Sequence, residues 1–183
     1  MGTWFVFNPA NGQIGDGPFL PNTRFGLGSI TDGTSNTMMA AEVRSWTHVR
    51  RTGGPTVVAV PKTVLEVESV LNGGTVYRDN GHTEWFSGNA HHEGVTTVLL
   101  PNASPRCSNG SSIVQPCDYS SWQEGSDGTI GKPSYAVVTS RSYHNGVVVV
   151  TMLDGSVRTV SENIDLPLWR ATGTRNGGEV TTE

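Results

Sequence analysis

Apolar and polar positions along the chain predict short strands joined by long polar loops, and a hairpin near the C-terminus is the clearest element. Residues 147–153 form an apolar run that stops at Asp154-Gly155, and a second β-rich run follows at residues 157–160. Asp-Gly between two such runs is typical of a tight hairpin, because a type I′ turn needs positive φ at both central residues. We therefore expect Asp154 and Gly155 to be structural turn residues.

The predicted turn also sets a register for the hairpin. With a two-residue turn, Leu153 would face Ser156 and, further out, His144 would face Asp165. The four consecutive valines at 147–150 do not alternate with polar residues. This pattern predicts a central strand that is covered on both faces.

Two helices are predicted from apolar spacing and end signals. The first covers residues 62–71, whose apolar stripe is followed by the stop signal at residues 72–74, Asn-Gly-Gly. The second covers residues 165–173, with Asp165 as its N-cap and Gly173 just past its end.

The remaining segments give strand patterns or no regular pattern. Residues 95–100 and 135–139 predict strands, whereas residues 37–46 fit either a strand or a short helix. Stretches rich in Gly, Pro, Asn and Ser are expected to be irregular, and these are residues 1–28, 75–92 and 101–133.

Composition narrows the class of protein. A length of 183 residues suits one domain, residues 1–183, with a proper core. The 23 glycines and a charged fraction of 15% favour a loop-rich β protein over a helical one. A net charge of −4 without a basic cluster argues against nucleic-acid partners. No apolar run reaches the roughly 18 residues of a membrane span, and no signal-peptide pattern opens the sequence.

The two cysteines, Cys107 and Cys117, flank a polar loop within the irregular segment 101–133. An isolated pair that closes a short loop favours a disulfide, which would place the domain outside the cytoplasm. A metal-binding pair is the alternative, but the spacing is not that of a zinc knuckle.

The hairpin belongs to a longer motif, in which His144 is followed by nine residues and then Asp154-Gly155. This motif fits the H-X9-DG signature of the DUF1559 family, which is abundant in planctomycete-type bacteria, and the chain resembles that family. Other similar stretches are spread along the chain and cover, with the hairpin, about half of it: residues 30–37 with Glu42, residues 89–102 and residues 164–179.

The resemblance implies a fold, a compartment and a class of partner. The fold would be α+β, a pilin-like head with an antiparallel or mixed β-sheet, one or two packed helices and long irregular loops. The protein would be exported to the periplasm or cell surface, related to type II secretion or type IV pili, with other pilin-like subunits or cell-surface components as partners. Such chains carry a prepilin cleavage site and a hydrophobic N-terminal helix; this sequence shows neither, which indicates a mature or truncated chain.

The histidines suggest a second kind of function. His144 and His92 each stand two residues before a glycine that opens an apolar run. If the two runs are parallel neighbours, both imidazoles emerge at one end of the sheet, and the hairpin register adds a carboxylate there. Imidazoles with a carboxylate suit a divalent metal, zinc better than calcium, and a metal-bound water can hydrolyse an ester or phosphoester. The candidate ligands are His91, His92, His144 and Asp165.

Simpler readings stand beside this metal site. The histidines could only form hydrogen bonds at strand ends. Glu42 lies among apolar neighbours and needs a partner, either an arginine or a metal. The oxygen-rich loop at residues 32–36 could bind calcium, but it lacks EF-hand spacing, so a plain turn is favoured. Trp85 and Trp122 could stack on sugars, although burial in the core is favoured.

Two functions are therefore carried forward from the sequence. The first is an exported pilin-like head with an interaction or assembly role. The alternative is a divalent-metal-dependent hydrolase of carboxylic or phosphate esters. The residues alone do not decide whether the protein is an enzyme.

Overall fold

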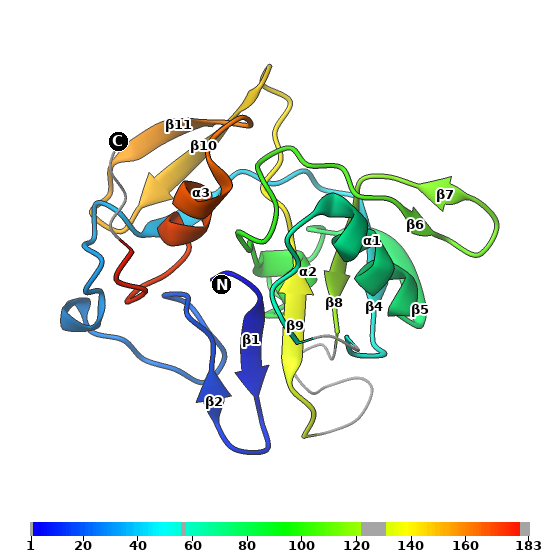
Figure 1. Cartoon of the computed structure of the whole chain (residues 1–183), viewed down its shortest axis with the longest axis horizontal. Coiled ribbons are helices and arrows are strands. Elements are labelled where there is room, and N and C mark those ends of the chain that lie inside the picture. The colour runs from blue at the N-terminus through cyan, green and yellow to red at the C-terminus, as the bar shows by residue number, and fades with distance from the viewer. Residues whose placement is uncertain (1, 56–57, 122–130, 180–183) are drawn as a thin grey trace.

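The computed structural model describes residues 2–55, 58–121 and 131–179, and within these ranges the chain is an α+β protein (Figure 1). The predicted fold class is thus confirmed. The strands form one large sheet, one sheet of three strands and a small ribbon, and three short α-helices pack against them.

The largest sheet has six strands in the order β2-β1-β9-β8-β4-β5. The strands β4 and β8 are parallel, while the other pairs are antiparallel, so the sheet is mixed. Its members come from distant parts of the chain: β1 (Phe5–Asn8), β2 (Gln13–Ile14), β4 (Thr47–Arg51), β5 (Val76–Gly81), β8 (Cys117–Ser120) and β9 (Ser134–Val137).

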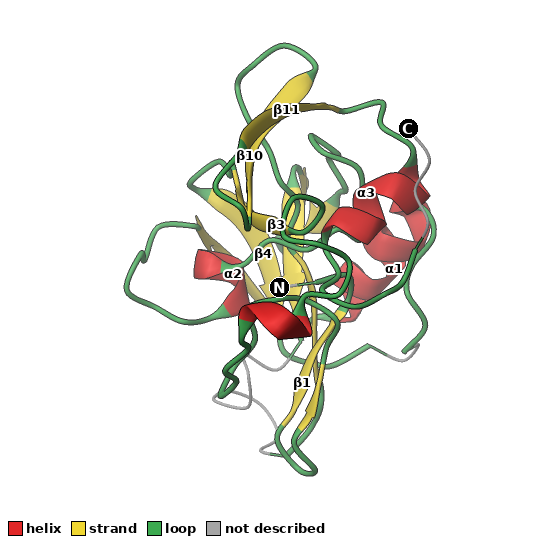
Figure 2. Cartoon of the chain, turned by 90° about the vertical axis from the view of Figure 1, so that its left-hand side faces the viewer, coloured by secondary structure: helices red, strands yellow, loops and turns green. Residues whose placement is uncertain are grey.

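Helices cover the two faces of this sheet, α1 (Val64–Gly73) on one side and α2 (Ala90–Glu93) on the other (Figure 2). Alternation along β9 explains the two cores, because successive side chains of a strand point to opposite faces. Val137 packs in the core that contains Val67 of α1, and Ala136 packs in the core that contains Ala90 of α2.

The three-stranded sheet has the order β11-β10-β3 and is antiparallel throughout. Its strands are β3 (Met38–Ala41), β10 (Val147–Met152) and β11 (Val157–Ser161), and α3 (Leu166–Thr172) packs beside it. The centre of this unit is Trp169, which is fully buried and donates its indole N–H to the carbonyl of Leu99 at 2.8 Å.

Both predicted helices are present. The helix α1 starts two residues later than expected, with Thr63 as the cap whose side chain accepts the amide of Glu66. The helix α3 has Asp165 as its N-cap and Gly173 as its C-cap, as predicted. Residues 37–46 contain the strand β3, one of the two alternatives left open.

The predicted hairpin exists, but its predicted register is wrong by one residue. Thr151 pairs with Val157, and the backbone of Met152 bonds to that of Ser156, so the loop has three residues. Gly155 alone in this loop has positive φ, +84°, which fits a type I turn followed by a left-handed glycine. The predicted facing pairs therefore do not form.

The prediction that the valine strand is covered on both faces is also only half right. The strand β10 is central in its sheet, but its side chains alternate between buried and half-buried positions. One face packs on α3 and the other remains partly open to solvent.

Several segments fold differently from their sequence patterns. Residues 95–100 contain no strand and carry only a single bridge between Thr96 and Gly2. Conversely, strands occur in all three segments expected to be irregular: β1 and β2 in residues 1–28, β5 in residues 75–92, and β6 (Cys107–Ser108), β7 (Ile113–Val114) and β8 in residues 101–133. The strands β5 and β8 pair with strands that are distant in sequence, as β1 does with β9, so local sequence did not reveal these pairs. The pairs β1–β2 and β6–β7 are local hairpins, which the sequence pattern did not predict either.

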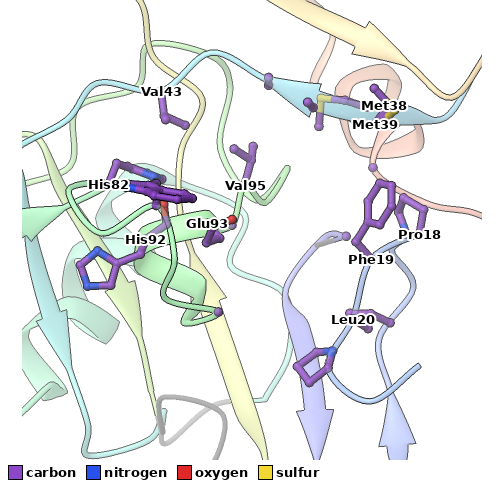
Figure 3. Close-up of a pocket in the computed structure, with 18 residues that line it drawn as sticks. Pro18, Phe19, Leu20, Met38, Met39, Val43, His82, His92, Glu93 and Val95 are labelled. Atoms are coloured by element: carbon purple, nitrogen blue, oxygen red, sulfur yellow. The ribbon is translucent and has the colours of Figure 1, made fainter. Parts of the chain in front are cut away.

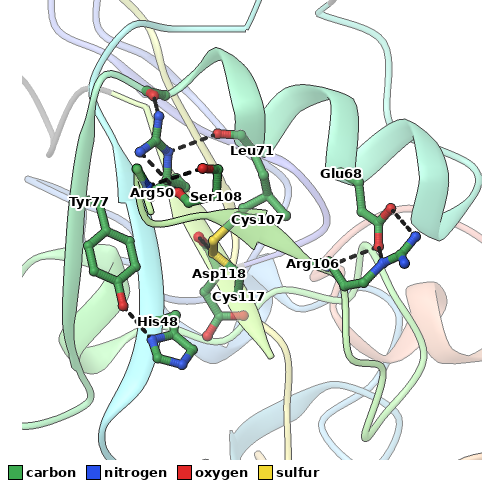
Figure 4. The surroundings of a disulfide bond; sticks show 12 residues. His48, Arg50, Glu68, Leu71, Tyr77, Arg106, Cys107, Ser108, Cys117 and Asp118 are labelled. Carbon is green, nitrogen blue, oxygen red and sulfur yellow. Dashed lines mark hydrogen bonds and ion pairs between the residues drawn. A yellow bond between two sulfur atoms is a disulfide. The ribbon is translucent and has the colours of Figure 1, made fainter. Parts of the chain in front are cut away.

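The predicted disulfide between Cys107 and Cys117 is confirmed (Figure 4). It joins the first strand of the β6–β7 ribbon to the start of β8. Arg106, beside it, forms an exposed ion pair with Glu68 of α1.

A buried ion pair connects the two larger sheets. Arg141 is 2% exposed and bonds both carboxylate oxygens of Asp118 in β8, at 2.8 and 3.0 Å. The guanidinium also donates to the carbonyl of Ala103, and the amide of Arg141 donates to the carbonyl of Glu42, next to β3. One residue thus holds β8, the loop after Leu100 and the end of β3 together.

Breaking this pair should destabilise the fold strongly. Arg141→Leu leaves the Asp118 carboxylate buried without its cation, and we expect a loss of about 3–5 kcal/mol in the free energy of unfolding. Urea unfolding followed by tryptophan fluorescence measures this loss. The double variant Arg141→Leu/Asp118→Leu should recover part of it, and Arg106→Ala, at the exposed pair, should remain close to wild type. A wild-type-like Arg141→Leu would contradict the role assigned to the pair.

Candidate functional site

A cleft of about 750 Å³ lies between the three-stranded sheet and the α2 side of the six-stranded sheet (Figure 3). Residues 18–21 and β3 form one wall, while residues 82–95 form the other. The volume falls within the roughly 300–1,000 Å³ of ligand-binding pockets.

Apolar side chains dominate the described lining of this cleft. Among the lining residues that the structure describes, Glu93 is the only Asp, Glu, Lys or Arg. The apolar members with side chains larger than alanine come from the N-terminal segment, β3 and its continuation, and the 82–95 loop: Pro18, Phe19, Leu20, Pro21, Met38, Met39, Val43, Trp85 and Val95. Such a surface suits an apolar ligand or partner better than a strongly charged one.

Large aromatic side chains stand exposed beside the cleft. Trp85 is 84% exposed and contacts Phe86 edge-to-face, with ring centroids 6.1 Å apart. The expectation that Trp85 fills the core is therefore wrong, while Trp122 lies outside the described residues. Trp46 is also exposed, and its amide bonds to Gly81, one residue before the 82–95 wall. Exposed apolar surface of this kind marks interaction sites.

Three histidines lie on the α2 side of the six-stranded sheet. His82 has a left-handed φ of +56°, and its Nδ1 donates to the carbonyl of His92 at 3.0 Å, which leaves Nε2 as the unprotonated nitrogen. His91 Nε2 lies 3.3 Å from the guanidinium of Arg51, and His92 Nε2 lies 3.5 Å from the carboxylate of Glu84. Among the described residues, the second nitrogen of each ring has no hydrogen-bond partner.

Burial keeps these imidazoles neutral. It lowers the pKa of His91 to about 3, with further contributions from His92 and the Arg51 cation. Burial likewise lowers the pKa of His82 and that of His92, although Asp118 and Glu84 respectively oppose the shift. Neutral imidazoles can act as hydrogen-bond donors, acceptors or metal ligands.

The four predicted metal ligands lie at three separate places. His91 and His92 belong to α2, His144 lies in the loop before β10, and Asp165 caps α3 by accepting the amide of Leu168. The premise of parallel neighbouring strands fails, because residues 95–100 form no strand beside β10. In the part of the chain that the structure describes, no three His, Cys, Asp or Glu side chains converge closely enough to hold a metal ion.

Glu42 is the actual neighbour of His144. Its Oε1 lies 3.2 Å from the Nε2 of His144, a side chain that is 61% exposed. Its Oε2 accepts the backbone amide of Val149 at 2.7 Å, while the backbone carbonyl of Glu42 turns to Ser140 and Arg141. The carboxylate thus takes the place of a backbone acceptor in the β3–β10 ladder. The sequence suggested an arginine or a metal as its partner; the partners seen among the described residues are His144 and the amide of Val149.

The remaining sequence candidates hold the chain together. Asp154 lies in the hairpin turn, where its carboxylate accepts the amide and hydroxyl of Ser156 and its own amide donates to Thr34. Asp32, in the loop considered for calcium, accepts the amides of Gly177 and Gly178. These bonds fasten the loop at residues 32–36 to the hairpin and to the C-terminal segment.

By its structure, the chain is an α+β protein with one disulfide among the described residues and an apolar cleft. The model of the family described as "Protein of unknown function (DUF1559)" matches residues 1–167, and the chain belongs to this family. No match was found among curated proteins or among solved structures. None of the described helices has the length and apolar character needed to cross a membrane.

Substitutions at Glu42 should separate a structural role from a metal-binding one. Glu42→Ala leaves the Val149 amide without its acceptor and should cost about 1–3 kcal/mol in unfolding free energy, whereas Glu42→Gln keeps an acceptor oxygen and should cost less. Urea denaturation measures both. His144→Ala should leave the metal content of the purified protein unchanged. Loss of bound zinc in His144→Ala would show instead that His144 is a ligand.

The low pKa of His91 predicts acid sensitivity. Above the unfolded pKa of about 6.5 both states are neutral and the protein has full stability. As the pH falls from about 6.5 toward 3, His91 becomes protonated in the unfolded chain but stays neutral in the folded protein. The free energy of unfolding therefore drops by up to about 1.4 kcal/mol per pH unit. His91→Gln should make the pH dependence shallower. An NMR titration midpoint for His91 near 6.5 would contradict this expectation.

Proposed function

We propose that this protein is an exported, pilin-like head domain whose role is interaction or assembly, and that the cleft is its binding surface. The observation that carries the proposal is the apolar cleft, with a half-exposed Met39 and a highly exposed Trp85 on opposite walls. Solvent-exposed apolar surface is costly to keep unless a partner covers it.

The disulfide supports the compartment in this proposal. A bond between Cys107 and Cys117 persists in oxidising surroundings such as the periplasm or the cell surface. Partners there would be other pilin-like subunits of secretion or pilus systems, or components of the cell surface. The apolar lining favours a protein partner over a glycan, since sugar hydroxyl groups require many polar contacts.

A divalent-metal-dependent hydrolase remains the second candidate. Its support is the pair of neutral histidines His91 and His92, whose ring centroids lie 4.1 Å apart and whose rings each have a nitrogen that lacks a partner within the described residues. Zinc fits such nitrogen ligands better than calcium does. Elemental analysis of the purified protein distinguishes this candidate from a metal-free binding domain.

In-cell crosslinking tests the interaction role. A photoreactive amino acid at position 39 or 85 should form a discrete adduct with an exported protein, which mass spectrometry identifies, because both side chains border the cleft. A matched probe at Leu65, exposed on α1 across the sheet from α2, should not form that adduct.

A second substitution makes the test specific. Glu introduced at Met39 places a charge on the apolar wall and should remove the adduct formed from position 85. Equal adducts from positions 65 and 85, or an adduct that survives Met39→Glu, would contradict a role for the cleft.

A further inference from the structure

The strand β3 is an edge strand, and its free edge borders the cleft. It is the last member of the order β11-β10-β3, and all four of its residues line the cleft. Edge strands carry backbone N–H and C=O groups that can pair with another chain. Within the described residues, no strand occupies this side of β3.

The register of the sheet identifies a backbone position that faces outward. Glu42 donates its amide to Val149, and Ala41 pairs with Val150. Because backbone groups of an antiparallel ladder point alternately toward and away from the partner strand, the N–H and C=O of Ala41 point away from β10. Those groups are available to a chain that enters the cleft.

The side chains that line the cleft indicate which kind of segment would fit beside the free edge of β3. Met39 on β3 and Val95 on the facing wall offer apolar surface, which suits the alternating side chains of an extended segment (Figure 3). Glu93 is the sole charged side chain in the described lining, and His82 and His92 are held neutral by burial. An occupant with one cation would complement that carboxylate.

We propose that the cleft binds an extended segment of a partner protein, apolar with a single Lys or Arg, which adds to β3 as a fourth strand of the three-stranded sheet. This inference rests on the interaction role proposed above and specifies its mode. Backbone pairing provides affinity in such strand addition, while alternate side chains provide specificity.

Short synthetic peptides test the proposal on the whole chain. The probes are a set of capped peptides of alternating Val and Thr. Each peptide contains one Lys, and the position of this Lys differs from one peptide to the next. Binding is followed by amide NMR shifts and hydrogen exchange. We expect the amide of Ala41 to become protected, together with shifts at Met39 and Val95.

Backbone methylation of the peptide provides the decisive control. In an extended peptide, alternate amides point toward β3 and the others point away from it. N-methyl groups on the amides that face β3 should weaken binding about tenfold for each hydrogen bond lost, whereas N-methyl groups on the amides that point away should have little effect. Exchanging the Lys of the peptide for Glu should weaken binding, and Glu93→Gln should remove most of that difference. Ala41→Pro removes the outward N–H and should weaken binding, with an unchanged NMR spectrum elsewhere as the check on folding.

The outcomes separate this mode from the interaction role itself. Frame-dependent methylation with protection of Ala41 supports strand addition. Peptide binding in the cleft without frame dependence overturns strand addition while the interaction role stands. Absence of any peptide binding, combined with a specific adduct from position 85 in cells, overturns the extended segment as the occupant. Absence of both overturns the interaction role as well.

Discussion

The arrangement of the two sheets depends on one desolvated charge pair, Arg141 with Asp118. Burying a guanidinium is costly unless an opposite charge neutralises it and hydrogen bonds satisfy its donors. Here the carboxylate of Asp118 in β8 neutralises it and the carbonyl of Ala103 accepts a further bond, while Nη2 has no partner among the described residues. Because the adjoining backbone also bonds to Glu42, the charge requirement fixes where β3 lies relative to the large sheet.

Features set by local chemistry could be predicted from the sequence. The cap of α3 at Asp165 and the turn at Gly155 follow from the preferences of single residues. The exact register of the hairpin did not follow, because Asp-Gly serves both two-residue and three-residue loops. The strands β1, β4 and β5 were missed, since β1 pairs with β9 besides its local partner β2, β4 pairs with β8, and β5 pairs with β4, all across long stretches of sequence.

The candidate site was harder to predict from the sequence than the fold. Its predicted ligands shared local patterns, but whether His92 and His144 meet depends on strand neighbours that spacing does not reveal. An arginine or a metal was expected as the partner of Glu42, and nothing local indicates that its carboxylate substitutes for a backbone acceptor. The cleft was not predicted at all, since its walls come from three separate segments. Trp85, a large aromatic residue in a segment without a regular pattern, was a signal that the sequence offered.

The same few residues after β9 tie down both walls of the cleft. Val138 exchanges hydrogen bonds with Thr96 behind one wall, and Ser140 and Arg141 bond to Glu42 at the end of the other. The walls of the cleft are therefore pre-organised, so the partner proposed for it would not have to order them and would lose mainly its own conformational entropy. Because the pair that holds the walls is shielded from solvent ions, the width of the opening should vary little with ionic strength. A cleft with fixed walls would suit repeated binding of flexible segments such as the proposed partner, because its shape stays the same each time.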